Sequence, residues 1–578
     1  MSTVEAPQPA KGIQLAAIIS GIAGFILFVL TPFMPVNQVQ SEVSWPQEEV
    51  GSLTSPLISY APVTWSADIP LRDVNKLNEG QSLVLGTLPA DSKDPTARGL
   101  FVRSTDSGVD VIVRNQVPLE LSADELQKLP EDAVLSISST STETTVEVPG
   151  TKFQGTIEGD VRPQVTGFYT ELDPTQVTTD GLHATTEVNS RFTSSPTLWK
   201  YLTMFGGVAL LIISLICLHL MDTTDGRSSR RILPLNWYKP RIIDVTVAAV
   251  LGYWYIFGAN TSDDGYLLTM ARVSHDATYM ANYYRWFGVP ESPFGAPYYD
   301  LLGAMAQVST ASIWMRLPEL IAALITWFII SREVLPRLGT QISTRAVAQW
   351  TAALSFLGFW IVYNNGLRPE PVIALGALLT WVSIERAIAT SRLLPAAVGV
   401  IIATISLGAG PTGLMAVAAL LAGLPSLIRV VQRRAPRKRT NDQGRKENNS
   451  RRRVAIAAML APFLASGTAI LLAVFGDQTL AGVLEAIKVR SAKGPSLAWY
   501  SEWVRYQTLM QQTVDGSFTR RFAVLMMLTC LAIVLASVLR NGKVPGAAAG
   551  PSHRLMMVFF GTMFFMMFTP TKWTHHFG

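Results

Sequence analysis

Two adjacent carboxylates, Asp263 and Asp264, stand in the segment TSDDGYLLTM directly between two apolar runs. Ionisable side chains held at the edge of a bilayer tend to line the path of a substrate or an ion. Asp-Asp-Gly also favours a solvated turn after a helix, and position alone does not decide between these interpretations. Glu291, in VPESPFG, is a third acid on the same predicted side of the membrane, with a role in loop solvation as the plainer alternative.

The groups that could complement these acids lie in two other segments. NNGLRPE places Arg368 and the amide of Asn365 at the start of an apolar run. TPTKWTHHFG supplies four more side chains: Lys572, Trp573, His575 and His576. Arg binds phosphate bidentately, and Lys and His add charge or a further donor. The alternative is that these residues only anchor the membrane interface, with Trp573 in the aromatic belt.

Together these side chains suit glycosyl transfer from a lipid-linked sugar phosphate. A carboxylate can take the proton of an acceptor hydroxyl as that oxygen attacks the anomeric carbon, while cations stabilise the departing phosphate. The sequence has no nucleotide-binding fingerprint or P-loop, which fits an enzyme that works outside the cytoplasm. It also has no HExxH or Cys/His ligand spacing, so we expect no metal or other cofactor; a structural calcium stays open, but no motif indicates one.

The elements that position these residues are predicted to be membrane helices. The 578 residues are 49% hydrophobic and 15% charged, whereas soluble domains carry about 25% charged residues. The net charge of +5 comes from short basic clusters between apolar runs, a pattern typical of orientation signals and unlike a nucleic-acid-binding surface. Cys217 and Cys530 both lie in apolar runs, which excludes a disulfide framework or a cysteine zinc site.

Apolar stretches that could cross a bilayer recur along the whole chain. We predict spans at residues 13–33, 201–221, 242–259, 317–331, 346–363, 370–384, 394–409, 411–428, 454–475, 522–539 and 555–570. Cytoplasmic loops are enriched in Lys and Arg, and alternate connectors here are basic, above all 429–453 with eleven cations against two anions. The loops carrying the acids, Arg368 and the histidines then face the periplasm, and we predict a multi-pass protein of the plasma membrane.

A large polar insert follows the first predicted span. Residues 35–198 alternate in strand-like pieces such as GVDVIVRN and TTVEV, separated by Pro, Gly, Asp and Ser. This pattern predicts an extracytoplasmic antiparallel β-sandwich, like a carbohydrate-binding module, although such domains also serve in adhesion or structure. The predicted organisation is an anchor helix at 1–34, the sandwich at 35–198 and a transmembrane catalytic region at 199–578.

The motifs above resemble those of a known family, the Emb arabinosyltransferases that build cell-wall arabinan in mycolate-bearing actinobacteria. The resemblance runs from SGIAGFILFVLTPFMPVNQ to the last residue and is strongest in SDDGYLLTMARV, NNGLRPEP, DQTLAGVLEA, KGPSLAWY, DGSFTRRF and TPTKWTHHFG. The B-type and the single corynebacterial-type members are the nearest in appearance. The resemblance implies a membrane glycosyltransferase of the GT-C class that uses decaprenyl-phosphoryl arabinofuranose as donor and inverts the anomeric carbon.

The resemblance also assigns roles to residues. It implies Asp263 as the catalytic base and Arg368 as the arginine on the phosphate side. Neighbours in the acceptor pocket, where the drug ethambutol competes in this family, would be Tyr266, Met270 and Glu291. Trp573, His575 and His576 match the terminal motif, and which histidine makes the contact stays open.

The same resemblance implies the binding partners. Beside the donor, the arabinan acceptor and the bilayer, the family implies a homo- or heterodimer with a paralogue and an acyl carrier protein, which could dock on 429–453. No nucleic acid is expected. Family members are about twice as long and end in a second carbohydrate-binding domain that this chain lacks, so the chain resembles an N-terminal fragment whose own activity is in doubt.

Other classes of protein remain as alternatives. A transporter would place polar groups at mid-span and show an internal repeat, whereas here the charges cluster at one face. Another transferase for polyprenyl-phosphate sugars shares the same chemical logic. A non-enzymatic membrane scaffold that binds wall glycan through the β domain is the third alternative.

Overall fold

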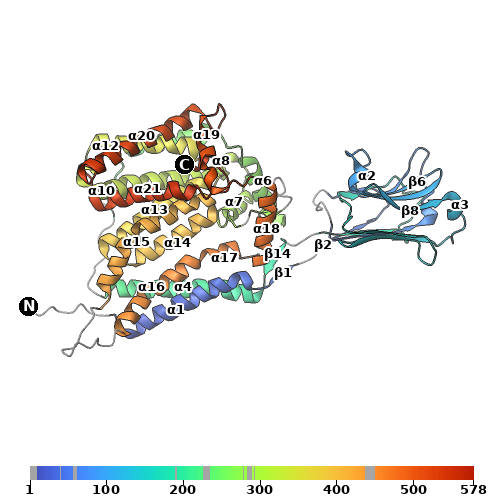
Figure 1. The fold of residues 1–578 in the computed structure, drawn as a ribbon, viewed down its shortest axis with the longest axis horizontal. Coiled ribbons are helices and arrows are strands. Elements are labelled where there is room, and N and C mark those ends of the chain that lie inside the picture. The colour runs from blue at the N-terminus through green and yellow to red at the C-terminus, as the bar shows by residue number, and fades with distance from the viewer. Residues whose placement is uncertain are drawn as a thin grey trace, which may run out of the picture. The chain divides into compact units, whose positions relative to one another are not determined.

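The computed structural model describes residues 9–38, 41–55, 62–188, 192–224, 233, 235–277, 279–282, 289–291, 293–436 and 450–577. These residues form two compact units (Figure 1). One unit comprises residues 1–37 and 195–578 and is helical, and the other, residues 38–194, is a β structure. Each unit is described by itself.

Helices occupy all of the predicted spans. The long helices are α1 (Lys11–Leu30), α4 (Leu198–Thr223), α5 (Ile242–Phe257), α9 (Leu317–Ile329), α12 (Ala346–Tyr363), α13 (Glu370–Thr390), α14 (Leu394–Ala409), α15 (Leu414–Arg434), α16 (Ser450–Thr468), α20 (Phe518–Asn541) and α21 (Ala549–Met566). Among the described residues, seven helices are long and apolar enough to cross a membrane, and α5 and α14 are apolar but shorter. The predicted multi-span helical architecture is therefore confirmed.

Shorter helices fill the connectors that we predicted as loops. They are α6 (Asp264–Ala277), α7 (Tyr298–Ala306), α8 (Ser312–Met315), α10 (Leu335–Leu338), α11 (Thr340–Ser343), α18 (Leu480–Lys493), α19 (Trp503–Met510) and the 3₁₀ turns η5 (Trp499–Glu502) and η6 (Thr574–Phe577). The predicted span 454–475 is divided between α16 and the short α17 (Ile470–Val474). Most of the predicted basic loop 429–453, residues 437–449, lies outside the described residues.

The helices approach closely where small residues face each other. A Cβ added to Gly21 of α1 would lie 2.6 Å from the backbone carbon of Ala461 in α16, so these two helices pack backbone to backbone. Small residues allow this approach in membrane helices, where van der Waals contact drives association. Helix α13 is the most enclosed candidate span and packs against α9, α14 and α15.

Buried ion pairs join helix ends that the charge pattern assigns to the cytoplasmic side. Arg434 pairs with Asp222, whose carboxylate accepts the backbone N–H groups of Leu393 and Leu394 at 3.0 and 2.8 Å. Further pairs of this kind are Arg332–Asp244, Arg386–Glu333 and Arg554–Glu385. Because these charges have partners, α13 and the segment after α9 continue as helix through sequences that we had read as polar connectors.

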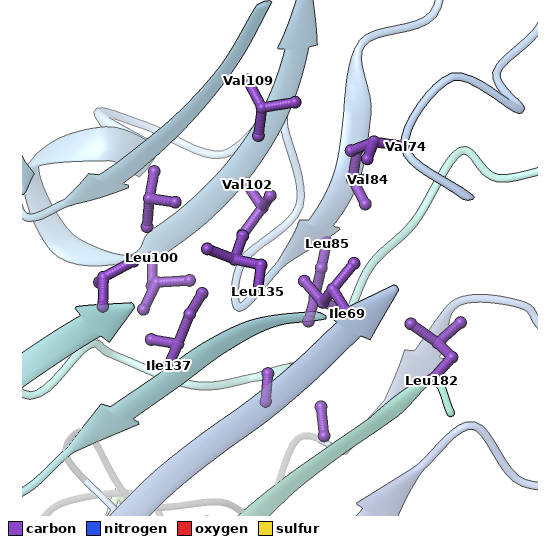
Figure 2. Close-up of a cluster of buried hydrophobic side chains, with 14 of the residues drawn as sticks. Ile69, Val74, Val84, Leu85, Leu100, Val102, Val109, Leu135, Ile137 and Leu182 are labelled. Atoms are coloured by element: carbon purple, nitrogen blue, oxygen red, sulfur yellow. The ribbon is translucent and has the colours of Figure 1, made fainter. Parts of the chain in front are cut away.

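The β unit is an antiparallel sandwich, as predicted. A six-stranded sheet has the order β11 (Gln154–Glu158), β10 (Glu143–Glu147), β9 (Val134–Ser139), β4 (Thr64–Pro70), β13 (His183–Val188) and β2 (Ser41–Trp45). A four-stranded sheet has the order β5 (Leu83–Gly86), β6 (Leu100–Thr105), β7 (Gly108–Val113) and β8 (Gln116–Ser122). Residues from both sheets, among them Ile69, Leu85, Val102 and Leu135, form one hydrophobic core (Figure 2).

Candidate active site

A large cavity in the helical unit has a volume of about 950 Å³. Seven stretches of chain line it: the turn after α5 with the start of α6, the segment before α7, the loop before α13, the turn after α14, the end of α18, the loop before α20 and the terminal segment around η6. Helices α6, α7 and α18 gather at this end of the unit (Figure 1). We call this cavity the site pocket.

The central contact of the site pocket joins Asp263 to Arg368. Oδ2 of Asp263 accepts from Nε of Arg368 at 2.8 Å, and Nη2 of Arg368 lies 2.8 Å from the same oxygen. The side chain of Asp263 is 28% exposed to the pocket, and that of Arg368 is 9% exposed. The pocket therefore presents a carboxylate and a guanidinium side by side.

Asp264 has a different position. Its Oδ1 accepts from the backbone N–H of Leu367 at 2.9 Å, and its Oδ2 accepts from the backbone N–H of Thr261 at 3.2 Å. The hydroxyl of Thr261 also donates to Oδ1. Asp264 thus ties the turn before α6 to the loop that carries Arg368, and it does not line the site pocket.

A second buried ion pair supports the same two segments. Glu319, at the start of α9, accepts from Nη2 of Arg316 at 3.1 Å and from the backbone N–H of Gly366 at 3.2 Å. Nη1 of Arg316 donates to the carbonyl of Gly258 at 3.1 Å. Both side chains are almost fully buried, so the pair fixes the loop of Arg368 and the turn of Asp263 from behind.

The terminal segment brings two histidines to the pocket. His575 and His576 stack edge to face with ring centroids 4.5 Å apart. Nδ1 of His576 lies 2.9 Å from Nη1 of the buried Arg505, and because arginine can only donate, this nitrogen is the acceptor. His576 is then a neutral imidazole with its proton on Nε2. Burial, with the neighbouring Arg505 and Arg368, also holds the pKa of His576 well below its usual range.

Burial likewise lowers the pKa of His575 well below its usual value, and the adjacent ring and arginines add to this effect. Nε2 of His575 is 3.7 Å from Oε1 of Glu370, the first residue of α13. The ligand atoms of Glu370, His575 and His576 all lie within 4.8 Å of one another, a spacing that a metal ion could use. The surrounding Arg368 and Arg505 oppose a divalent cation there and favour an anion.

Glu291 also lines the pocket, together with Arg490. Oε1 of Glu291 accepts from Nδ2 of the buried Asn282 at 2.7 Å, and Oε2 lies 3.7 Å from Nε of Arg490 on α18. Tyr266, one turn after Asp263 on α6, lines the pocket as well. A polar ligand in the pocket would therefore meet carboxylates, guanidinium groups and imidazoles close to one another.

The structure brings together most of the residues that we predicted for the site. Eight of them line the pocket: Asp263, Tyr266, Glu291, Asn365, Arg368, Trp573, His575 and His576. Asp264, Met270 and Lys572 do not line it. Met270 is buried behind Tyr266 on the same face of α6, and Nζ of Lys572 donates to the carbonyls of Met567 and Thr569 at 2.6 and 2.9 Å.

The sequence did not single out several charged residues that the structure places at the site. Arg490, Arg520, Asp515 and Glu370 line the pocket, and Arg505 holds His576 from behind. Arg505 and Arg520 lie in segments predicted to face the same side as Asp263. That shared side was the only signal, because a role for an individual arginine depends on which loops meet in space.

Fold and pocket together define a multi-pass membrane protein of the GT-C type with an inserted β-sandwich. Residues 195–578 match the family profile described as mycobacterial cell wall arabinan synthesis protein, and the chain belongs to this family. Residues 37–191 match the arabinosyltransferase concanavalin-like domain. The predicted fold class and family are therefore confirmed.

Known relatives agree with this assignment. The chain is 44% identical over 98% of its length to a probable arabinosyltransferase C of Mycolicibacterium smegmatis, and 43% identical to a probable arabinosyltransferase B of Mycobacterium bovis. The cryo-EM structure of arabinosyltransferase EmbB from Mycobacterium smegmatis superposes with a TM-score of 0.81 at 40% identity, again over 98% of this chain. The chain spans 52% of the length of each of these relatives.

Proposed function

We propose that this protein transfers arabinofuranose from a polyprenyl-phosphate donor to a growing cell-wall arabinan, with inversion at the anomeric carbon. The observation that carries the proposal is the contact between Asp263 and Arg368 in a pocket that also holds two neutral histidines. Membership of the arabinan-synthesis family supplies the class of sugar.

The reaction needs one base and one site for the leaving group. Asp263 takes the proton of an acceptor hydroxyl while the oxygen of that hydroxyl forms a bond to the anomeric carbon. The bond between this carbon and the phosphate oxygen breaks, and its electron pair leaves with the polyprenyl phosphate. Before this step, when the donor binds, Arg368 exchanges its contact with Asp263 for the phosphate, which frees the carboxylate to act as the base.

The imidazole end of the pocket suits the phosphate. His576 keeps an N–H on Nε2 because its Nδ1 accepts from Arg505, so a neutral donor stands beside the guanidinium of Arg368. Donors that are fixed before the reaction stabilise developing charge without reorganisation. The carboxylates of Asp263 and Glu291 are acceptors that suit the hydroxyl groups of a neutral acceptor.

The same proposal includes the donor lipid, the membrane side of the pocket, an inhibitor and the protein partners. The donor lipid is decaprenyl phosphate, the pocket faces the periplasm across the plasma membrane, and ethambutol competes for the acceptor end. The protein pairs with a second copy or a paralogue, and an acyl carrier protein docks on 429–453. The basic composition of that loop supports both its cytoplasmic placement and an acidic partner.

The test is a reconstituted transfer assay with the full-length protein in lipid nanodiscs. A synthetic polyprenyl-phosphate arabinofuranose and a short arabinofuranoside acceptor should yield a product one ring longer, with a linkage of inverted configuration by NMR. Preference for a mannosyl-phosphate donor would replace the proposal with a different sugar transferase. Acceptor binding without any product from either donor would favour the glycan-binding scaffold.

A further inference from the structure

A second cavity, of about 250 Å³, lies beside the site pocket. The faces of α6 and α7, the end of α17 and the residues just after it line this cavity. We call it the side cavity. Its size is below the range of about 300–1,000 Å³ typical for drug-sized ligands, so it suits one small ring rather than a chain.

The two cavities share a wall. Glu291, Phe294 and Tyr299 line both the site pocket and the side cavity. Glu291 is held in place by Asn282 and Arg490, so this wall is a fixed feature of the site. The site pocket and the side cavity are therefore immediate neighbours, with Glu291 in contact with both.

The lining of the side cavity has the chemistry of a sugar subsite. Asp300 stands at its exposed mouth, Asp477 is half-buried, and Gln478 is buried beside it. Carboxylates and amides can pair with neighbouring hydroxyl groups as acceptors and donors. Tyr279, Tyr299 and Phe294 add apolar ring faces to the same lining.

The two cavities differ in their charged lining residues and therefore suit different parts of the substrate. Among the described residues, no Lys or Arg lines the side cavity, whereas Arg368, Arg490 and Arg520 line the site pocket.

Behind the lining of the side cavity, Nζ of the buried Lys200 donates to the carbonyl of Gln478 at 2.6 Å, and its charge offsets part of that of Asp477. The lining itself holds three carboxylates, Glu291, Asp300 and Asp477, which disfavour a phosphate and accept the hydroxyl groups of a neutral polyol. The side cavity is thus suited to a part of the substrate that carries no phosphate.

We propose that the side cavity binds a neutral sugar ring of the acceptor glycan, next to the ring whose hydroxyl Asp263 activates. This proposal rests on the proposed function, because it places the acceptor relative to Asp263. The side cavity then decides how long an acceptor must be for tight binding. A single ring reaches only the site pocket, and a second or third ring gains the contacts of Asp477 and Gln478.

The experiment measures acceptor binding separately from transfer. Methyl arabinofuranosides of one, two and three rings are titrated into the full-length protein by calorimetry. Asp477→Asn removes one carboxylate of the side cavity, and Ala473→Phe fills the cavity from the end of α17. Asp276→Asn, an exposed acid on α6 that lines neither cavity, is the matched control.

We expect the longer acceptors to bind the unchanged protein more tightly than the single ring. Ala473→Phe should remove this gain, and Asp477→Asn should reduce it about tenfold, as for one hydrogen bond to a charged group. Both variants should bind the single ring as before. The proposal would be overturned if the two variants lost the same affinity for acceptors of every length, or lost none. It would also be overturned if a chelator abolished acceptor binding, because the carboxylates would then be holding a metal ion.

The same titrations separate this proposal from the proposed function. Length-dependent binding that the variants abolish, in a protein that forms no product, would leave the subsite standing and contradict the transferase. If the side-cavity variants transferred arabinose to long acceptors as well as the unchanged protein does, the transferase function would stand and the subsite proposal would be contradicted.

Discussion

At the scale of single residues, the two neighbouring acids have separate tasks. Asp263 faces the site pocket and holds Arg368, whereas Asp264 accepts backbone N–H groups from two loops. The residue types alone could not distinguish them, because both stand in the same Asp-Asp-Gly turn; only the family resemblance pointed to Asp263 as the base. The direction of each side chain depends on the contact with Leu367 and Arg368, more than a hundred residues further along the chain.

This difference predicts that changes at Asp263 reduce the rate of transfer, whereas changes at Asp264 reduce stability. Asp263→Asn keeps an oxygen for Arg368 but cannot take a proton, so we expect kcat to fall by at least about 100-fold in a protein that remains folded. Asp264→Ala removes the acceptor of the buried N–H of Leu367, and we expect a loss of about 1–3 kcal/mol in stability. Transfer rates and thermal melts of both variants measure this. Full transfer by Asp263→Asn would exclude this carboxylate as the base.

The histidine pair predicts a pH dependence of stability. Burial lowers the folded-state pKa of His576 well below the unfolded value of 6.5. Above pH 6.5 both states hold neutral imidazole; as the pH falls below 6.5, only the unfolded chain takes up the proton, so the free energy of unfolding decreases. The melting temperature should therefore decrease as the pH is lowered from 7.5 to 5.

His576→Asn should flatten that decrease, because its amide oxygen can still accept from Arg505 and the side chain does not titrate. His183→Asn, an exposed histidine in the β unit, is the control and should leave the slope unchanged. An unchanged slope in His576→Asn would contradict the buried neutral imidazole.

At the scale of elements, the conformation of the loop before α13 requires a glycine at position 366. Gly366 has φ of +78°, and an added Cβ would lie 2.5 Å from Oδ1 of Asp264. Gly366→Ala therefore adds backbone strain of about 1–2 kcal/mol and pushes against the carboxylate that joins the two loops. We expect lower thermal stability together with slower transfer, since Asp263 and Arg368 move apart.

The matched control for this loop is Gly252→Ala on α5, where an added Cβ meets nothing within 4 Å. We expect that variant to melt and react as the unchanged protein does. Equal behaviour of the two glycine variants in melts and transfer assays would show that the loop geometry at residue 366 is not needed.

The long helices could be predicted from the sequence, but their ends could not. A run of apolar residues reveals a span directly, whereas Glu385 and Arg386 were read as the end of one because they are charged. In the structure they lie inside α13, since Arg554 and Glu333 neutralise them. Helices α6, α18 and α19 were missed for a related reason: they are short and mixed in polarity, and tertiary contacts decide their conformation.

At the scale of the whole molecule, the β unit has what an independent domain needs. Its core draws on both sheets and is closed within residues 38–194. A recombinant segment 38–194 should be soluble without detergent and unfold in one cooperative transition, measured by circular dichroism and calorimetry. A non-cooperative melt with exposed hydrophobic surface would show that the unit needs the helical part to fold.

The whole account depends on where the donor binds in the helical unit. The most direct measurement is a cryo-EM structure of the full-length Asp263→Asn protein in nanodiscs with a polyprenyl-phosphate arabinofuranose. We predict phosphate oxygens within hydrogen-bond distance of Arg368 and the terminal histidines, with the anomeric carbon facing residue 263. A phosphate bound outside the site pocket, or a sugar turned away from residue 263, would contradict the account.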